Sequence, residues 1–176
     1  MKKLLFVIDY QKDFVDGALG FPGAELLDSP IAQKIGAYHA AGYDVAFTLD
    51  THGEDYLSTQ EGRRLPVPHC LRASEGWQLY GNTAQARRDG DKLIEKPAFP
   101  SMALGNWLRE KGYGQIELVG LVSYICVISN AVVAKAALPE AEILVDASCT
   151  AGPDPVLHEK CLDLIEQGLQ ITIINR

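Results

Sequence analysis

The chain has 176 residues, of which 47% are hydrophobic and 22% charged, and a formal net charge of −7 at pH 7. This acidic balance argues against nucleic acid or an anionic membrane as a partner, and no apolar run reaches the roughly 18 residues that a membrane span requires. The length predicts one domain over residues 1–176, with a core large enough to need no disulfides.

The first apolar run and the cysteines indicate the compartment. Leu4–Ile8 is broken by Asp9 after five residues, which favours a first strand over a secretory signal. The cysteines show no CxxC pair or regular spacing, so neither a disulfide framework nor a cysteine-only zinc site is implied. We expect a cytoplasmic protein with reduced thiols. The cysteines are Cys70, Cys126, Cys149 and Cys161.

Apolar runs that are typical of buried strands alternate with segments of helical periodicity. Because the strand-like runs are continuously apolar, both faces of their sheet should be covered by helices. We therefore predict an α/β fold, a doubly wound six-stranded parallel sheet in the order 3-2-1-4-5-6 with helices on both faces. The strands are expected at Leu4–Ile8, Asp44–Leu49, Lys92–Glu95, Ile116–Leu121, Glu142–Val145 and Gln170–Ile174, and the helices at Pro30–Ala41, Met102–Lys111, Tyr124–Leu138 and Pro155–Gln167.

Glycines and long aperiodic segments punctuate this pattern. Gly42, Gly112 and Gly168 each follow a predicted helix, where a left-handed residue commonly ends the helix. Tyr10–Asp28 and Thr51–Asp91 show no periodicity, and loops of that length in a compact domain are usually functional.

Polar residues follow four of the predicted strands. Asp9 comes after the first strand, Asp50 and His52 after the second, Lys96 after the third and Cys126 after the fourth. Parallel sheets bind ligands beyond the carboxyl ends of their strands, where the strand order reverses. We therefore expect these side chains to share one site.

Cys126 is the candidate nucleophile of that site. Ser123 is placed to cap the following helix, so Cys126 should lie in its first turn, where the helix dipole favours a thiolate. The alternative is a small buried cysteine that only packs. Asp9 could serve as general base for the thiol, and Lys96 could stabilise the negative charges, although each could also be a turn or flanking residue.

Asp50, His52 and His69 form a candidate metal site. Residues 50 and 52 project to the same side of an extended segment, and His69 can return from the long aperiodic stretch. Carboxylate and imidazole suit zinc, iron or manganese. The alternative is a capping aspartate beside surface histidines. His39 and His158 lie in predicted helices and are interpreted as ordinary surface or packing residues.

Three segments resemble the isochorismatase-like cysteine hydrolase family over nearly the whole chain. They are Asp9-Tyr10-Gln11-Lys12-Asp13-Phe14, Lys96, and the run from Gly120 to Val127. The resemblance implies a Rossmann-like three-layer fold with Asp9 as acid/base, Lys96 as catalytic lysine and Cys126 as nucleophile. It also implies a cis peptide between Leu121 and Val122, with the N–H groups of Val122 and Cys126 as oxyanion hole.

Within the family, the chain is most similar to the nicotinamidases. Asp50, His52 and His69 match that branch's metal ligands, and Pro68-His69-Cys70 resembles one of its segments. The resemblance implies a bound divalent ion, zinc first and iron or manganese as alternatives, which orients a pyridine nitrogen. It further implies attack by Cys126 on the carboxamide, a thioester intermediate, a role in NAD salvage and a homo-oligomer. Expected ring contacts are Phe14, Phe99 and Tyr124.

Some positions depart from the nicotinamidase pattern. Leu65-Pro66-Val67 stands where an aromatic residue is common, Tyr124 stands where an aspartate is common, and residues 97–101 are short for their loop. The alternatives are therefore a metal-independent amide or carbamoyl hydrolase of the same family, an isochorismatase, and a non-catalytic module that kept the fold. The intact Asp9, Lys96 and Cys126 count against the last.

Overall fold

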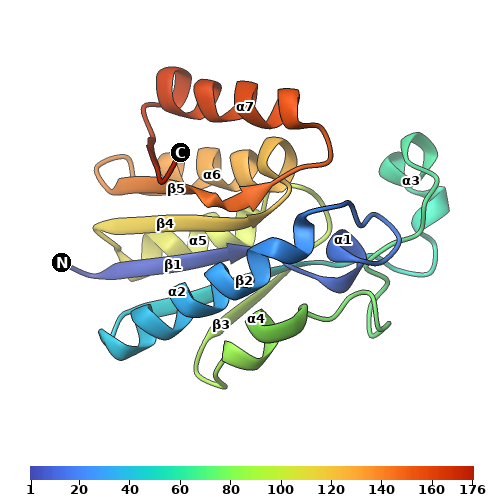
Figure 1. Ribbon diagram of the computed structural model, residues 1–176, viewed down its shortest axis with the longest axis horizontal. Helices are drawn as coiled ribbons and strands as arrows, with labels where there is room; N and C mark the ends of the chain where they lie inside the picture. The colour runs from blue at the N-terminus through green and yellow to red at the C-terminus, as the bar shows by residue number, and fades with distance from the viewer.

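Six parallel strands form one sheet in the order β3-β2-β1-β4-β5-β6 (Figure 1). This confirms the predicted order. The computed structural model describes residues 1–176. The order reverses between β1 and β4, so the crevice expected for a ligand lies at their carboxyl ends. The strands are β1 Lys3–Ile8, β2 Asp44–Asp50, β3 Lys92–Lys96, β4 Gln115–Leu121, β5 Glu142–Ala151 and β6 Thr172–Ile174.

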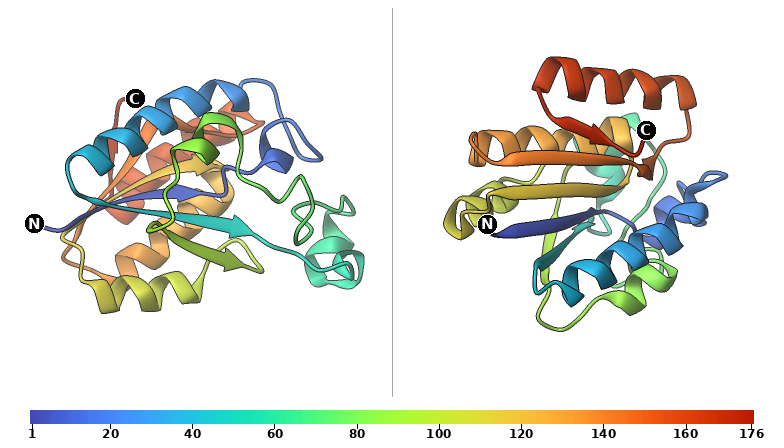
Figure 2. Two further views of the ribbon diagram at one scale, coloured as in Figure 1. Left: turned by 90° about the horizontal axis from the view of Figure 1, so that it is seen from below. Right: turned by 60° about the vertical axis from the view of Figure 1, so that its left-hand side comes forward.

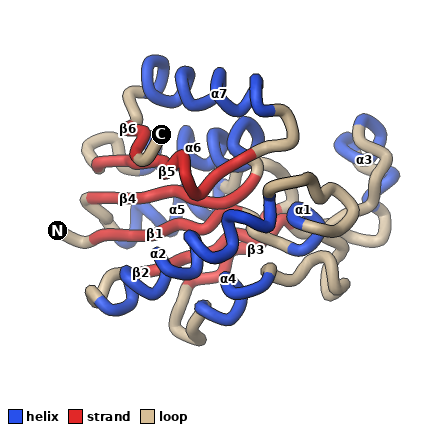
Figure 3. The backbone as a smooth tube through the Cα atoms, viewed as in Figure 1, coloured by secondary structure: helices blue, strands red, loops and turns tan.

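Helices cover both faces of the sheet (Figures 2 and 3). Successive residues of β1 point to opposite faces: Leu4, Phe6 and Ile8 enter the core of one layer, and Leu5 and Val7 enter the core of the other. One layer holds α2 Asp28–Ala40 and α4 Gly81–Ala86, and the other holds α5 Met102–Lys111, α6 Ile128–Ala137 and α7 Pro155–Asp163.

The two aperiodic stretches contain short helical pieces that periodicity could not reveal. A helix of one turn cannot show a 3.6-residue pattern, so contacts with the rest of the fold decide its conformation. These pieces are α1 Lys12–Val15, η1 Ala24–Leu27, η2 Tyr56–Ser58, α3 Gln60–Arg64 and α4.

Two of the three glycine predictions agree with the backbone. Gly42 and Gly112 have φ of 72° and 65° after α2 and α5. The prediction for Gly168 is wrong, because α7 continues into a π-helical turn, η4 Leu164–Gly168, and Gln170 takes the left-handed conformation instead, with φ of 54°. None of the helices combines the length and apolar character that crossing a bilayer demands.

Candidate active site

The carboxyl ends of β1, β3 and β4 bring Asp9, Lys96 and Cys126 into one contact cluster. Lys96 Nζ lies 2.7 Å from Asp9 Oδ2 and 3.5 Å from Cys126 Sγ, and it donates to the Ala98 carbonyl at 3.1 Å. All three side chains are buried, and Lys96 is only 1% exposed. A buried ammonium is stable only with such partners, so the interior position of Lys96 depends on Asp9 and the surrounding acceptors.

Two contacts fix the orientation of Asp9. Its backbone has φ of 46°, a left-handed conformation that is uncommon for a residue other than glycine. Thr48, on the neighbouring strand β2, donates its hydroxyl to Asp9 Oδ1 at 2.7 Å and accepts the Asp9 N–H at 3.1 Å. This reciprocal pair turns the carboxylate toward Lys96.

Burial and charge set the protonation of the cluster. Burial raises the pKa of Asp9, and Asp50 adds to this, whereas Lys96 opposes it without cancelling it. Burial lowers the pKa of Lys96, but the charges of Asp9, Cys126 and Asp50 outweigh burial and raise it. The lysine therefore stays cationic, and Asp9 holds a proton more readily than an exposed aspartate.

The nucleophile turn, which we define as Ser123–Val127 (η3), departs from the predicted helix. It is a π-helical turn, and α6 begins only at Ile128. Ser123 does not cap it; the Ser123 hydroxyl is instead hydrogen-bonded to His158 Nδ1 at 2.9 Å. The prediction of a readily ionised thiol is wrong as well, because burial and the negative charge of Asp9 raise the pKa of Cys126 more than Lys96 lowers it.

The peptide bond before this turn is the cis bond that the resemblance implied. It joins Leu121 and Val122. Val122 and Cys126, the two residues expected to supply oxyanion N–H groups, line the same pocket.

Four potential metal-ligating side chains converge next to this cluster. His52 Nε2 is 2.9 Å and His69 Nε2 is 3.4 Å from Asp50 Oδ2, so the predicted donors do meet. The ligand atoms of Asp50, His52, His69 and Glu61 all lie within 4.8 Å of one another. Lys96 Nζ, 3.2 Å from Asp50 Oδ1, connects this donor group to Cys126.

Glu61 is the member that the sequence did not reveal. It lies on α3 in the aperiodic stretch, and its Oε1 is 3.9 Å from His52 Nε2 and 3.7 Å from His69 Nε2. Glu61 Oε1 is buried and has no hydrogen-bond partner. An orphaned buried carboxylate oxygen facing two imidazoles fits a divalent cation, and this mixed donor set suits zinc, iron or manganese.

The electrostatics of Asp50 agree with a ligand role. Burial raises its pKa, but hydrogen bonds from His52 and His69 and the charge of Lys96 outweigh burial and lower it. Asp50 therefore remains an anion, which is the state that binds metal ions.

Gln11 and Asp13, in the opening motif, hydrogen-bond to the backbone of the segments that carry the metal-ligating side chains. Gln11 is fully buried; its side chain accepts the Asp50 N–H at 2.7 Å and donates to the Asp50 carbonyl at 3.0 Å. Asp13 Oδ2 accepts the Cys70 N–H at 2.7 Å, next to His69. The sequence marked both residues as motif members, but only the structure shows that they hold the donor segments in place.

A small apolar pocket lies over both groups of polar side chains. Its cavity volume is about 50 Å³. The Phe14 ring stands 5.6 Å from the His69 ring, and Phe99 forms part of the wall. The lining residues are Phe14, Leu19, Asp50, Glu61, Leu65, His69, Phe99, Val122, Ile125 and Cys126.

Tyr124 does not line the pocket, contrary to expectation. Its hydroxyl accepts the Asp154 N–H at 3.2 Å, and its ring packs so closely on Gly152 that a Cβ there would lie 2.4 Å from a ring carbon. The next residue of the turn, Ile125, faces the pocket instead.

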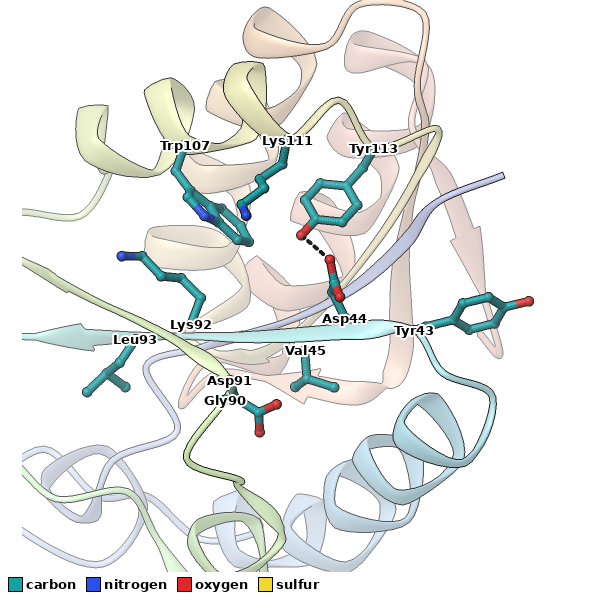
Figure 4. Close-up of a pocket in the computed structure, with 10 residues that line it drawn as sticks. All are labelled: Tyr43, Asp44, Val45, Gly90, Asp91, Lys92, Leu93, Trp107, Lys111 and Tyr113. Atoms are coloured by element: carbon teal, nitrogen blue, oxygen red, sulfur yellow. Dashed lines mark hydrogen bonds between the residues drawn. The ribbon is translucent and has the colours of Figure 1, made fainter.

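A larger groove lies at the opposite edge of the sheet, where β2 and β3 begin (Figure 4). Its volume is about 470 Å³. Its wall includes Trp107, Lys111 and Tyr113 but no cysteine or histidine. Its acidic groups are paired within the protein; the Tyr113 hydroxyl, for example, donates to Asp44 at 2.7 Å. The candidate chemistry is therefore in the smaller pocket.

The fold and this constellation define a parallel α/β protein whose candidate active site is centred on a buried cysteine. The chain belongs to the isochorismatase family, because residues 3–174 match the isochorismatase domain. It is 33% identical to the isochorismatase family protein PncA of Bacillus subtilis (strain 168) over 144 residues, which cover 75% of this chain and 78% of that protein.

Solved structures agree with this assignment. The nicotinamidase/pyrazinamidase PncA of Bacillus subtilis superposes with a TM-score of 0.87 at 29% identity, over 98% of this chain and 99% of that one. The pyrazinamidase of Pyrococcus horikoshii, in complex with zinc, has a TM-score of 0.86 over 100% of both chains at 23% identity, which shows a common fold. This chain is a hydrolase that acts on amide C–N bonds.

Proposed function

We propose that the protein hydrolyses nicotinamide, or a close pyridine or pyrazine carboxamide, to the acid and ammonia. The observation that carries the proposal is the union, in one small apolar pocket, of a buried thiol with a donor group suited to a metal ion. A thiol can attack the carboxamide carbon, whereas a metal-type donor group beside it suits a ring nitrogen. The relatives described as nicotinamidase and pyrazinamidase support the same substrate class.

Asp9, Lys96 and Cys126 would carry the chemistry. Asp9 takes the thiol proton, and the charge of Lys96 stabilises the thiolate that forms. The thiolate attacks the carboxamide carbon, and the N–H groups of Val122 and Cys126 stabilise the oxyanion. Asp9 then returns its proton to the departing ammonia, which leaves a thioester. A water molecule, deprotonated by Asp9, hydrolyses the thioester and releases the acid and the free thiol.

Asp50, His52 and His69, joined by Glu61, would hold a divalent ion, with zinc as the first expectation and iron or manganese as alternatives. When bound, the ion supplies a Lewis-acidic position for the ring nitrogen. The residues around it support this role: Gln11 and Asp13 hold the donor segments, and Asp50 stays ionised. The zinc complex of the Pyrococcus horikoshii enzyme has the same fold.

The walls of the pocket would select a flat, uncharged ring. Phe14 and Phe99 offer aromatic contact, and Leu19 and Leu65 add aliphatic surface. Leu65 stands near the position where nicotinamidases carry an aromatic residue, so the ring would meet a narrower aromatic wall here. We expect smaller heteroaromatic amides to bind better than bulky or charged ones.

Ammonia release tests the proposal directly. The purified protein should release ammonia from nicotinamide and pyrazinamide, and a chelator should slow both reactions. Benzamide is the matched control, since it has the same size and amide but lacks the ring nitrogen; its slower turnover should respond much less to chelation. Turnover of acyclic or carbamoyl substrates alone, unaffected by chelator, would instead establish the metal-independent family alternative.

This function would place the protein in NAD salvage. We also propose a cytoplasmic location, which the absence of disulfides among the four buried cysteines supports, and a homo-oligomeric state. Fractionation of cells with an antibody against the protein tests the first, and light scattering of the purified chain tests the second.

A further inference from the structure

The helix α7 and the loop before it contact the start of the nucleophile turn. Ser123, the first residue of the turn, is fully buried and lies three residues before Cys126. Its hydroxyl is hydrogen-bonded to His158 Nδ1 of α7 at 2.9 Å, and its carbonyl accepts the thiol of Cys161 at 3.3 Å. Two side chains of one helix therefore hold the hydroxyl and the carbonyl of a single turn residue.

The loop that leads into α7 adds two further contacts. The N–H of Asp154 donates to the Tyr124 hydroxyl at 3.2 Å. Gly152 approaches so closely that a Cβ would lie 2.9 Å from a Val122 methyl carbon as well as against the Tyr124 ring. Although α7 lies on the outside of the fold in Figure 1, the helix contacts Ser123 and the loop before it contacts Val122 and Tyr124.

The two ends of the nucleophile turn are held differently. At its far end, Asn130 of α6 donates to the Cys126 carbonyl at 2.8 Å. At its near end, the N–H groups of Ile125 and Val127 both share the Val122 carbonyl, and no side chain of the turn caps it. The near end therefore relies on α7 for its side-chain hydrogen bonds.

We propose that His158 is a positioning residue for the reaction: through Ser123 it fixes the turn that presents Val122 and Cys126 to the substrate. This inference rests on the proposed function, since it assumes that the turn delivers the nucleophile. His158 does not line the pocket, so it acts only through Ser123. Small displacements of a reacting group are costly, and about 1 Å can lower a rate by roughly 100-fold.

Replacement of His158 by leucine and by asparagine separates positioning from packing. Leucine keeps volume but removes the hydrogen bond, whereas asparagine places an amide atom near the position of Nδ1. We expect His158→Leu to lower kcat by about tenfold with little change in KM or metal content. His158→Asn should recover most of the loss. Lys160→Ala, an exposed change on the same helix, is the matched control and should leave kcat unchanged.

Replacement of Ser123, the hydrogen-bond partner of His158, provides a second test. Ser123→Ala should lower kcat to a similar extent, and the double variant Ser123→Ala/His158→Leu should be no worse than either single one, because the same hydrogen bond is lost in each. Multiplying losses in the double variant, or normal kcat in His158→Leu with only a lowered melting temperature, would overturn the proposal and leave His158 as a packing residue.

A substrate-free measurement separates this proposal from the proposed function. The rate at which iodoacetamide alkylates Cys126, followed by mass spectrometry, should change in His158→Leu and return toward wild type in His158→Asn. If nicotinamide is not turned over by the wild-type protein but alkylation follows this pattern, the substrate assignment fails and the positioning role stands. Identical alkylation rates in all variants, with normal turnover, would refute the positioning role alone.

Discussion

The two ends of the parallel strands, which we call the amino edge and the carboxyl edge of the sheet, carry pockets of opposite character. At the amino edge, the groove lined by Trp107 and Lys111 is wide and exposed, and its acidic groups are hydrogen-bonded to neighbouring side chains. At the carboxyl edge, the pocket over Cys126 is almost ten times smaller by the same measure of volume, about 50 Å³ against about 470 Å³. Its floor holds two buried groups of ionisable side chains that Lys96 connects.

This difference shows that size does not locate the chemistry. Charged side chains are costly to bury, and a fold retains them where they bind a partner or react. The parallel sheet explains why they collect at one edge, since every strand ends there and the loops that follow are free to vary. Activity should therefore depend on the side chains at the carboxyl edge and not on those of the large groove.

The largest effect should come from Cys126→Ala. It removes the proposed nucleophile and little volume, so turnover should fall by many powers of ten while the fold and metal content persist. Cys149→Ala is the matched control, because Cys149 is equally buried but outside the pocket. Ammonia release and circular dichroism measure the two effects; turnover of Cys126→Ala within tenfold of wild type would exclude the thioester route.

Asp9→Asn should separate turnover from thiol reactivity. The amide cannot accept the thiol proton, so turnover should fall by roughly 100- to 10,000-fold. The negative charge of Asp9 helps to raise the pKa of Cys126, and its removal should lower that pKa while Lys96 remains cationic. The pH profile of alkylation by iodoacetamide should therefore shift to lower pH. A shift to higher pH would indicate that Asp9 already holds the thiol proton in the resting enzyme.

Glu61→Gln tests the donor that only the structure revealed. The amide is neutral and nearly isosteric, so metal affinity should fall by about 10- to 100-fold, as for other supporting groups at metal sites. Elemental analysis after dialysis against graded chelator measures the change, with Glu54→Gln on the exposed surface as control. Turnover of nicotinamide should fall more than that of benzamide; equal metal retention in both variants would remove Glu61 from the site.

The smallest effect should come from the amino edge. Lys111→Ala and Lys92→Ala alter the large groove without touching a residue of the catalytic pocket. Steady-state kinetics with nicotinamide should give kcat and KM within about twofold of wild type, since exposed substitutions of this kind rarely alter a distant site. A large change in either parameter would show that the two edges are coupled.

Local pattern was enough to predict the sheet and the residues at its carboxyl edge. Continuous apolar runs defined the strands, and strand order together with the geometry of parallel sheets placed Asp9, Asp50, Lys96 and Cys126 together. His69 was expected from its residue type and its place in the long aperiodic stretch, and the family resemblance pointed to the same residue. These features are set by short segments whose apolar faces must be buried. The spacing of apolar residues in the sequence shows which segments these are.

Tertiary contacts decided the remaining features. Glu61 reaches the donor group only because the aperiodic stretch folds back as α3, and the nucleophile turn is π-helical although its sequence is compatible with a regular helix. The pKa of Cys126 is raised because burial and the negative charge of Asp9 outweigh the charge of Lys96, and these causes depend on residues far away in sequence. Desolvation and through-space charge act between segments that only the folded chain brings together, so the sequence pattern carried no signal of them.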